Sequence, residues 1–305
     1  MDSVPSAFLE NLCARLQKKS LEELQKILNL WSRTVETHYS RRRELTVHLN
    51  PNKDETKVGI GINKYGDWYT EVPYTSLSKY DRIRCIFLGF TTCANLPNTI
   101  TMERFKTKVL PVLTSMTDVF VLEAVYRSPK NLMESLFSFL RAPALNIYTG
   151  YTGQKCVEFI EQQIALGRLK KLNLKDGNEW PESMKTSLLA FLKSSNFKSL
   201  DLRETNLTVD LDMLIIMVER FYRRDFRHNA IILGNSAHGE TKDFQEAVRS
   251  DGTIPLVYGL PEPSEISRNE EMFWIYWTLP GSENARLRLK YVSRPDSVTI
   301  RRECL

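Results

Sequence analysis

The residues that could carry out catalysis in this chain are few and scattered. The sequence contains no G-x-S-x-G nucleophile elbow, no H-E-x-x-H pair and no S-x-x-K with its partner motifs. Gly59-Ile60-Gly61 lies inside a strand pattern, without the Lys-Ser/Thr pair and the following helix that a phosphate-binding loop needs. His238 follows the end of a predicted strand, where α/β proteins often bind ligands, and is the best enzyme candidate. We interpret its segment as an ordinary turn, and we expect no catalytic site and no cofactor.

Metal chemistry is equally poorly supported. The five cysteines are Cys13, Cys85, Cys93, Cys156 and Cys304, no two of them are spaced as C-x-x-C, and the four histidines are dispersed. A zinc site formed by neighbouring residues is therefore not expected. We predict five free, mostly buried thiols and no metal site.

A cluster of cations follows the helix predicted at residues 211–222. Arg223, Arg224, Arg227 and His228 would be favoured there by the helix dipole. The alternative is an RNA-stacking patch, in which the neighbouring aromatic residues take part. The net charge of +5 is small for 305 residues, so we do not expect nucleic acid as a partner.

The composition is typical of a soluble globular protein of one long domain or two. Hydrophobic residues make up 42% of the chain and charged residues 26%, and no stretch approaches the roughly 20 apolar residues of a membrane helix. Residues 1–5 lack the basic and apolar segments of a signal peptide. We therefore expect a cytoplasmic or nuclear protein.

Two short amphipathic helices are predicted in the first 31 residues. Phe8, Leu12 and Leu16 lie four residues apart, and Ser20 with Glu23 has the pattern of a capping box that starts a second helix. Two such helices cannot cover all of their apolar surface against each other. Either the rest of the chain or a partner protein covers the remainder. Residues 41–43, three arginines, are interpreted as a solvated basic face.

This N-terminal pattern resembles the F-box, and the whole chain looks like the nematode F-box-like proteins. The residues that take the places of the F-box motif are Val4, Pro5, Phe8, Leu12, Leu16, Leu21, Leu24, Ile27 and Trp31. Ala7 and Ser20 replace the motif's acidic residues. The resemblance implies that these nine positions bind the core adaptor protein of a cullin-type ubiquitin ligase.

Short strands alternate with helices from residue 82 onward, after strands predicted at 46–49, 57–62 and 68–72. The predicted strands are 82–90, 119–126, 145–148, 169–174, 200–202 and 229–233, and the predicted helices are 102–113, 132–140, 156–166, 184–192, 211–222 and 244–248. Near-constant spacing and Leu-Asn-Leu or Leu-Asp-Leu strands indicate leucine-rich-repeat-like units with one polar sheet face. We predict a curved parallel sheet with its helices on the convex side. A doubly wound sheet is the alternative.

The C-terminal stretch has the alternation of antiparallel strands. Residues 273–277 are rich in strand formers, and residues 286–291 alternate basic and apolar side chains before a turn and a return strand at 298–300. We predict a hairpin that caps the end of the repeat-like sheet.

The fold class predicted is therefore α/β, with a helical F-box-like element at 1–45. A βα repeat-like target-binding domain follows at 46–305, with capping strands from about residue 254. The predicted function is a substrate-recognition adaptor that binds the ligase core adaptor and a protein target. A repeat-type interaction scaffold is the first alternative, and an α/β enzyme with a site near His238 is the second.

Overall fold

The computed structural model describes residues 5–27, 32–67, 69–125, 129–175, 180–226, 229–236, 261–269, 271–279, 281–293 and 296–304. The chain forms two compact units. Residues 1–123 with 129–142 make the first unit, and residues 124–128 with 143–305 make the second. The boundary predicted at residue 45 falls within the first unit.

The first unit opens with three helices, α1 (Ser6–Arg15), α2 (Lys18–Ile27) and α3 (Ser32–Arg41). The predicted capping box is wrong, because α2 begins two residues before Ser20 and the Leu21 N–H donates to the Gln17 carbonyl at 3.0 Å. Helix α3 was not predicted, since Val35 and His38 are its only buried side chains and they make a sparse apolar stripe.

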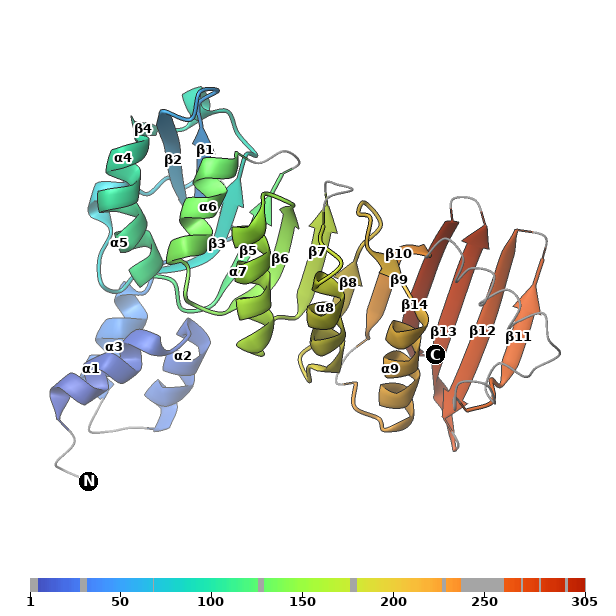
Figure 1. Ribbon diagram of the computed structural model, residues 1–305. Helices are drawn as coiled ribbons and strands as arrows, with labels where there is room; N and C mark the ends of the chain where they lie inside the picture. The colour runs from blue at the N-terminus through green and yellow to red at the C-terminus, as the bar shows by residue number, and fades with distance from the viewer. Residues whose placement is uncertain are drawn as a thin grey trace. The chain divides into compact units, whose positions relative to one another are not determined.

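A mixed sheet with helices on one face completes the first unit (Figure 1). Its elements are β1 (Glu44–Pro51), β2 (Lys57–Lys64), η1 (Tyr74–Ser76), β3 (Arg82–Leu88), η2 (Cys93–Asn95), β4 (Asn98–Thr101), α4 (Met102–Arg104), η3 (Phe105–Val109), α5 (Leu110–Ser115), β5 (Phe120–Ala124) and α6 (Lys130–Phe139). The strand order is β5-β3-β1-β2-β4, with β1 antiparallel to β2 and parallel to β3. Apolar residues of β1 and β3 pack against Leu110, Leu113 and Leu136 of the helices.

The strand predicted at 68–72 is not formed. Trp68 lies outside the described residues, and Glu71 makes only an isolated bridge to Asn63. The hairpin of this region is instead β1–β2. Gly59 belongs to β2 and not to a phosphate loop: a Cβ there would lie 2.8 Å from the Cys93 carbonyl oxygen, so the close approach of η2 requires glycine.

The second unit begins with the predicted βα repeats. Its elements are β6 (Ala144–Gly150), α7 (Gln154–Ala165), β7 (Lys171–Lys175), α8 (Met184–Lys193), β8 (Ser199–Asp201), β9 (Thr208–Val209), α9 (Leu211–Tyr222) and β10 (Ile231–Ser236). The pairs β6–β7, β7–β8 and β8–β10 are all parallel, which confirms the predicted order. The register aligns Ile147, Leu172, Leu200 and Ile232 across the four strands, and all four are buried.

The helices α7, α8 and α9 lie on one face of this sheet (Figure 1). The other face carries half-buried side chains such as Asn173. This one-sided arrangement matches the repeat-like prediction, and not the doubly wound alternative, which has helices on both faces. Asn206 bonds both the N–H and the carbonyl of buried Trp180, at 3.1 and 2.8 Å. That pairing gives Asn206 a structural role in holding the loop before α8.

Antiparallel strands end the chain, as predicted. They are β11 (Glu265–Arg268), β12 (Met272–Leu279), β13 (Ser282–Ser293) and β14 (Asp296–Cys304). Strand β14 pairs antiparallel with β10, so the last strand of the parallel series is hydrogen-bonded and not open. Strand β11 was not predicted, and the helix predicted at 244–248 lies outside the described residues.

Within the described ranges, no helix is long and apolar enough to cross a membrane. Cys13, Cys85, Cys93 and Cys156 are free thiols, which agrees with the prediction for these four. The side chain of Cys304 lies outside the described residues.

Candidate functional site

The N-terminal helices α1, α2 and α3 form a small cluster with its own core. Cys13, Leu21 and Val35 contribute one buried side chain from each helix. Leu16, Leu24 and Tyr39 are partly buried and pack against them. Every member of this core precedes residue 45. The helices therefore cover their central apolar residues with one another.

The predicted partner-binding residues fall into three groups. Pro5, Phe8 and Ile27 are exposed, with Phe8 at 56% and Ile27 at 73%. Leu12, Leu16 and Leu24 are half-buried. Leu21 of α2 is completely buried in the cluster core with Cys13 and Val35, so it is not part of the exposed surface that a partner could contact.

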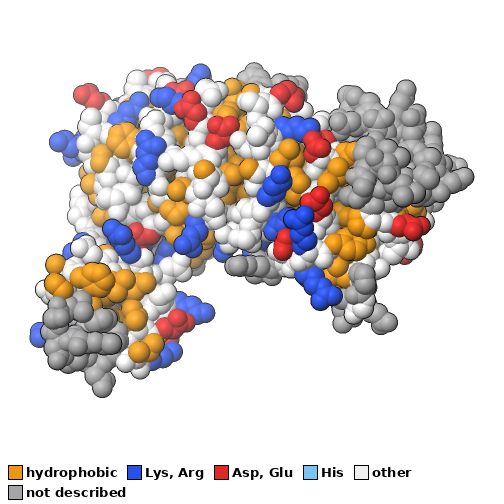
Figure 2. All heavy atoms as spheres, turned by 60° about the horizontal axis from the view of Figure 1, so that its bottom comes forward, with side chains coloured by type: hydrophobic (Ala, Val, Ile, Leu, Met, Phe, Trp, Pro, Cys, Tyr) orange, Lys and Arg blue, Asp and Glu red, His pale blue; other side chains and the backbone are white. Residues whose placement is uncertain are grey.

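Val4 and Trp31 lie outside the described residues. Figure 2 shows hydrophobic side chains gathered over the N-terminal helices. Among the described residues of the nine predicted positions, the exposed ones are therefore Pro5, Phe8 and Ile27.

Two buried arginines anchor the C-terminal end of α1. The Arg42 guanidinium donates to the Cys13 carbonyl at 2.6 Å, and Nε of Arg82 donates to the Ala14 carbonyl at 2.9 Å. The last carbonyls of a helix lack partners within the helix and carry a partial negative charge, so cations stabilise them. Arg82 is 6% exposed and also pairs with Asp118 at 2.7 Å. These contacts attach the helices to the sheet of the same unit.

This anchor corrects the interpretation of the three arginines at 41–43 as a solvated face. Arg41 is exposed, but Arg42 is buried, and burial lowers its pKa to about 10. Arg43 pairs with the buried carboxylate of Asp81 at 2.7 Å. The position of the three arginines in the sequence could have revealed this. They join a helix directly to a strand, so side chains on one side of this link must face the packed interior.

A second polar contact joins α1 to α3. Nε2 of buried His38 lies 3.1 Å from Oε2 of Glu10, and Nζ of Lys79 lies 3.0 Å from the same oxygen. Burial lowers the pKa of His38, although Glu10 opposes this shift. The hydrogen bonds from Lys79 and His38 lower the pKa of Glu10. The arrangement is a structural tie between the helices, with a carboxylate already engaged by two partners.

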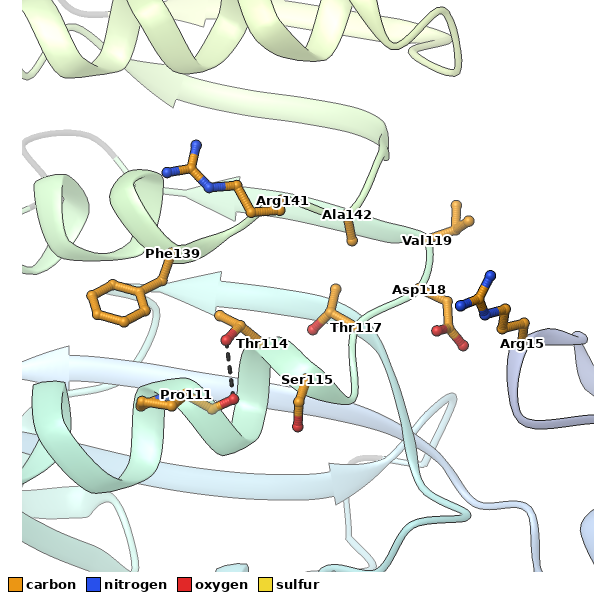
Figure 3. Close-up of a pocket in the computed structure, with 10 residues that line it drawn as sticks. All are labelled: Arg15, Pro111, Thr114, Ser115, Thr117, Asp118, Val119, Phe139, Arg141 and Ala142. Atoms are coloured by element: carbon orange, nitrogen blue, oxygen red, sulfur yellow. Dashed lines mark hydrogen bonds between the residues drawn. The ribbon is translucent and has the colours of Figure 1, made fainter. Parts of the chain in front are cut away.

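A pocket of about 850 Å³ lies in the first unit beside the C-terminal end of α5 (Figure 3). Its hydroxyls are engaged: Ser115 donates to Val112 O at 2.7 Å and Thr117 to Leu113 O at 2.9 Å. Arg15 and Arg141 lie at opposite ends of the pocket, and Asp118 is paired with Arg82. The lining places no nucleophile beside a base, the arrangement that nucleophilic catalysis needs.

The histidine that the sequence offers as an enzyme candidate is His238, and His228 belongs to the predicted cation cluster. His228 and His238 both lie outside the described residues. Among the residues that the structure describes, no group of three His, Cys, Asp or Glu side chains could hold a metal ion. Burial raises the pKa of Cys85 to about 12 and that of Cys156 to about 11, so both thiols stay protonated near neutral pH.

Comparison with known proteins adds no identification: no family model, no curated protein and no solved structure matches this chain.

Proposed function

We propose that this chain is an adaptor of a cullin-type ubiquitin ligase, which docks the ligase core adaptor with α1 and α2 and a protein target with the repeat-like unit. The observation that supports this most is the exposure of Phe8 and Ile27 on helices whose core is already closed by Cys13, Leu21 and Val35. A helical cluster that needs no further chain to cover it can offer its remaining apolar side chains to a partner.

An adaptor needs no covalent chemistry of its own. It holds a target close to the ligase and thereby raises the effective concentration of the target at the reactive centre. The engaged hydroxyls and the paired Asp118 of the Figure 3 pocket are consistent with such a passive role.

The second candidate function is a repeat-type interaction scaffold in which the helices only cap the first unit. The anchoring of α1 by Arg42 and Arg82 favours it, because a cap must be held firmly to the body that it covers. The two candidates differ in what the exposed residues of α1 and α2 do.

The double variant Phe8→Asp/Ile27→Asp separates these functions. Both side chains are more than half exposed, so the folded protein tolerates the charges, whereas a docked interface would have to desolvate them without a partner. We expect binding to the purified core adaptor to weaken by about 100-fold or more, with a melting temperature near that of the wild type. Leu24 is unsuitable for this test because it packs against the helical core.

Phe90→Asp is the matched control, since Phe90 is 52% exposed in the same unit but lies outside the helices. It should bind the core adaptor as the wild type does. Wild-type protein that does not bind the core adaptor, or a double variant that binds unchanged, contradicts the adaptor function. A double variant that loses much of its thermal stability favours the scaffold.

A further inference from the structure

The outward face of the C-terminal sheet gathers cations and aromatic rings. Along β12 the side chains of Phe273, Ile275 and Trp277 are buried, and α9 contacts β12 and β14. The alternate positions of the strands face the other way and are half-buried or exposed. This outward set is Trp274, Tyr276, Arg286, Arg288, Lys290 and Arg301.

The strand register arranges this face in two rows. In the first row Tyr276 lies opposite Arg288, which lies opposite Arg301. In the second row Trp274 lies opposite Lys290. Neighbouring strands are about 4.8 Å apart. A band of cations on β13 and β14 is therefore flanked by aromatic rings on β12.

Strand β10 adds an apolar border on the other side of the cations. Ile231 lies opposite Arg301, and Leu233 lies opposite Thr299, both on the outward face and both half-buried. The outward face thus combines apolar and cationic positions within a few strands.

The charges of this face are not balanced within the sheet. Arg288 and Arg301 lie directly opposite each other, an arrangement of like charges that destabilises an antiparallel pair. Glu303 is shared by Arg286 and Arg288, at 2.9 Å from each. Lys290 and Arg301 have no ion-pair partner among the described residues. An anionic ligand would relieve this repulsion.

We propose that this face, defined by the six outward residues above, binds an extended acidic polypeptide segment that also carries apolar side chains. The proposal rests on the proposed function and names the chemistry of the target that the repeat-like unit would bind. Acidic side chains would pair with Lys290 and Arg301, and apolar ones would pack on Trp274 and on Ile231 or Leu233. The apolar border makes the face a poorer match to a nucleic acid, which needs a longer basic track.

A random copolymer of Glu and Tyr is a suitable probe, with polyuridylate as the comparison. The full-length protein should bind the copolymer more tightly than polyuridylate, and the affinity should fall as sodium chloride is added. Lys290→Glu/Arg301→Glu should bind it at least about tenfold more weakly. Lys290→Gln/Arg301→Gln should weaken binding in the same direction without adding charge, and it serves if the charge reversal impairs folding.

Arg223→Glu is the control, because Arg223 is 70% exposed on the end of α9, away from this face, and its reversal should leave binding unchanged. Wild-type protein that does not bind the copolymer, or that prefers polyuridylate, overturns the proposal. Equal binding by the wild type and the Lys290/Arg301 variants overturns it as well.

The same variants keep this proposal separate from the adaptor function. Lys290→Glu/Arg301→Glu should still bind the ligase core adaptor, and Phe8→Asp/Ile27→Asp should still bind the copolymer. If the core adaptor is not bound but the copolymer results are as expected, this face binds acidic segments and the ligase function is rejected. If the core adaptor is bound but the copolymer results fail, the ligase function is retained and the acidic-segment proposal is rejected.

Discussion

Replacing Arg82 with alanine should release α1 from the sheet of the first unit. The Arg82 guanidinium donates to the Ala14 carbonyl at 2.9 Å, to the Lys79 carbonyl at 2.8 Å and to the Asp81 carbonyl at 2.6 Å, and it pairs with Asp118. The side chain is 6% exposed, so its removal leaves carbonyls and a carboxylate without their cation.

The size of the effect follows from the burial of the partners. Removing one member of a buried ion pair costs about 3–5 kcal/mol, and a hydrogen bond to a charged group contributes about 1.5–3 kcal/mol, but these values are not additive. The side chain of Asp118 is 27% exposed, so water can solvate the carboxylate that remains. We therefore expect a loss near the lower end, about 3 kcal/mol.

Native-state hydrogen exchange of the α1 amides measures this loss where it occurs. A change of about 3 kcal/mol in the free energy of opening corresponds to exchange faster by roughly 100-fold. Arg82→Met retains an apolar stem and should show a similar change, because the missing group is the cation.

Arg223→Ala is the matched control. Arg223 is 70% exposed and lies 3.6 Å from Glu219 in an i,i+4 pair, which contributes only a few tenths of a kcal/mol. Exchange of α1 in Arg82→Ala within threefold of the wild type would refute the anchoring role of Arg82.

Three further experiments test the helical cluster and the accessibility of the thiols. Leu21→Ala should destabilise the helical cluster by about 2–5 kcal/mol, because Leu21 is fully buried, whereas Ile27→Ala should have little effect; chemical denaturation followed by helix circular dichroism compares them, and equal effects would contradict the assigned core. Burial holds the pKa of folded His38 below its ordinary 6.5, so the unfolded chain binds this proton first as the pH falls. The stability that neutral His38 contributes is therefore complete above about pH 6.5 and is lost as the pH falls toward the lower pKa of the folded state. His38→Gln should accordingly weaken the dependence of the free energy of unfolding on pH between 7 and 5, and an unchanged dependence would reject this assignment. Among the four described thiols, Cys93 is the one not buried, so iodoacetamide should modify it before Cys13, Cys85 or Cys156 in the native protein; peptide mass analysis that finds Cys156 labelled first would contradict the packing of α7.

The sequence predicted the repeat-like region well because its signals are local. Helix α9 has the predicted bounds, since its apolar periodicity is dense and Asp210 caps it by accepting the Met213 N–H at 3.0 Å. The parallel order of β6, β7 and β8 followed from strand spacing, because strands joined by a helix of this length return in the same direction. The segment at 68–72 shows the limit of such signals: despite its strand-forming residues, it makes only an isolated bridge, between Glu71 and Asn63 of β2.

The candidate site was only partly predictable. Periodicity indicated that Phe8 and Leu21 are apolar positions of helices, but it could not say which one faces water, because that depends on α3, which carries Val35. The outward cations of β13 were visible as an alternation with apolar residues. The neighbours of these cations on the next strand were not visible in the sequence. Arg288 lies opposite Arg301 because of the register between β13 and β14, which the sequence pattern does not give.

The sequence by itself therefore determined the alternating strands and helices of the repeat-like region and the direction in which its strands run. Tertiary structure alone decided which polar groups meet. Arg82 and Ala14 are 68 residues apart in the chain, and Arg42 and Cys13 are 29 apart. Their hydrogen bonds satisfy buried groups that have no partner nearby in sequence. Local propensity carries no information about such contacts, because their free energy arises only when the two elements pack and exclude water between them.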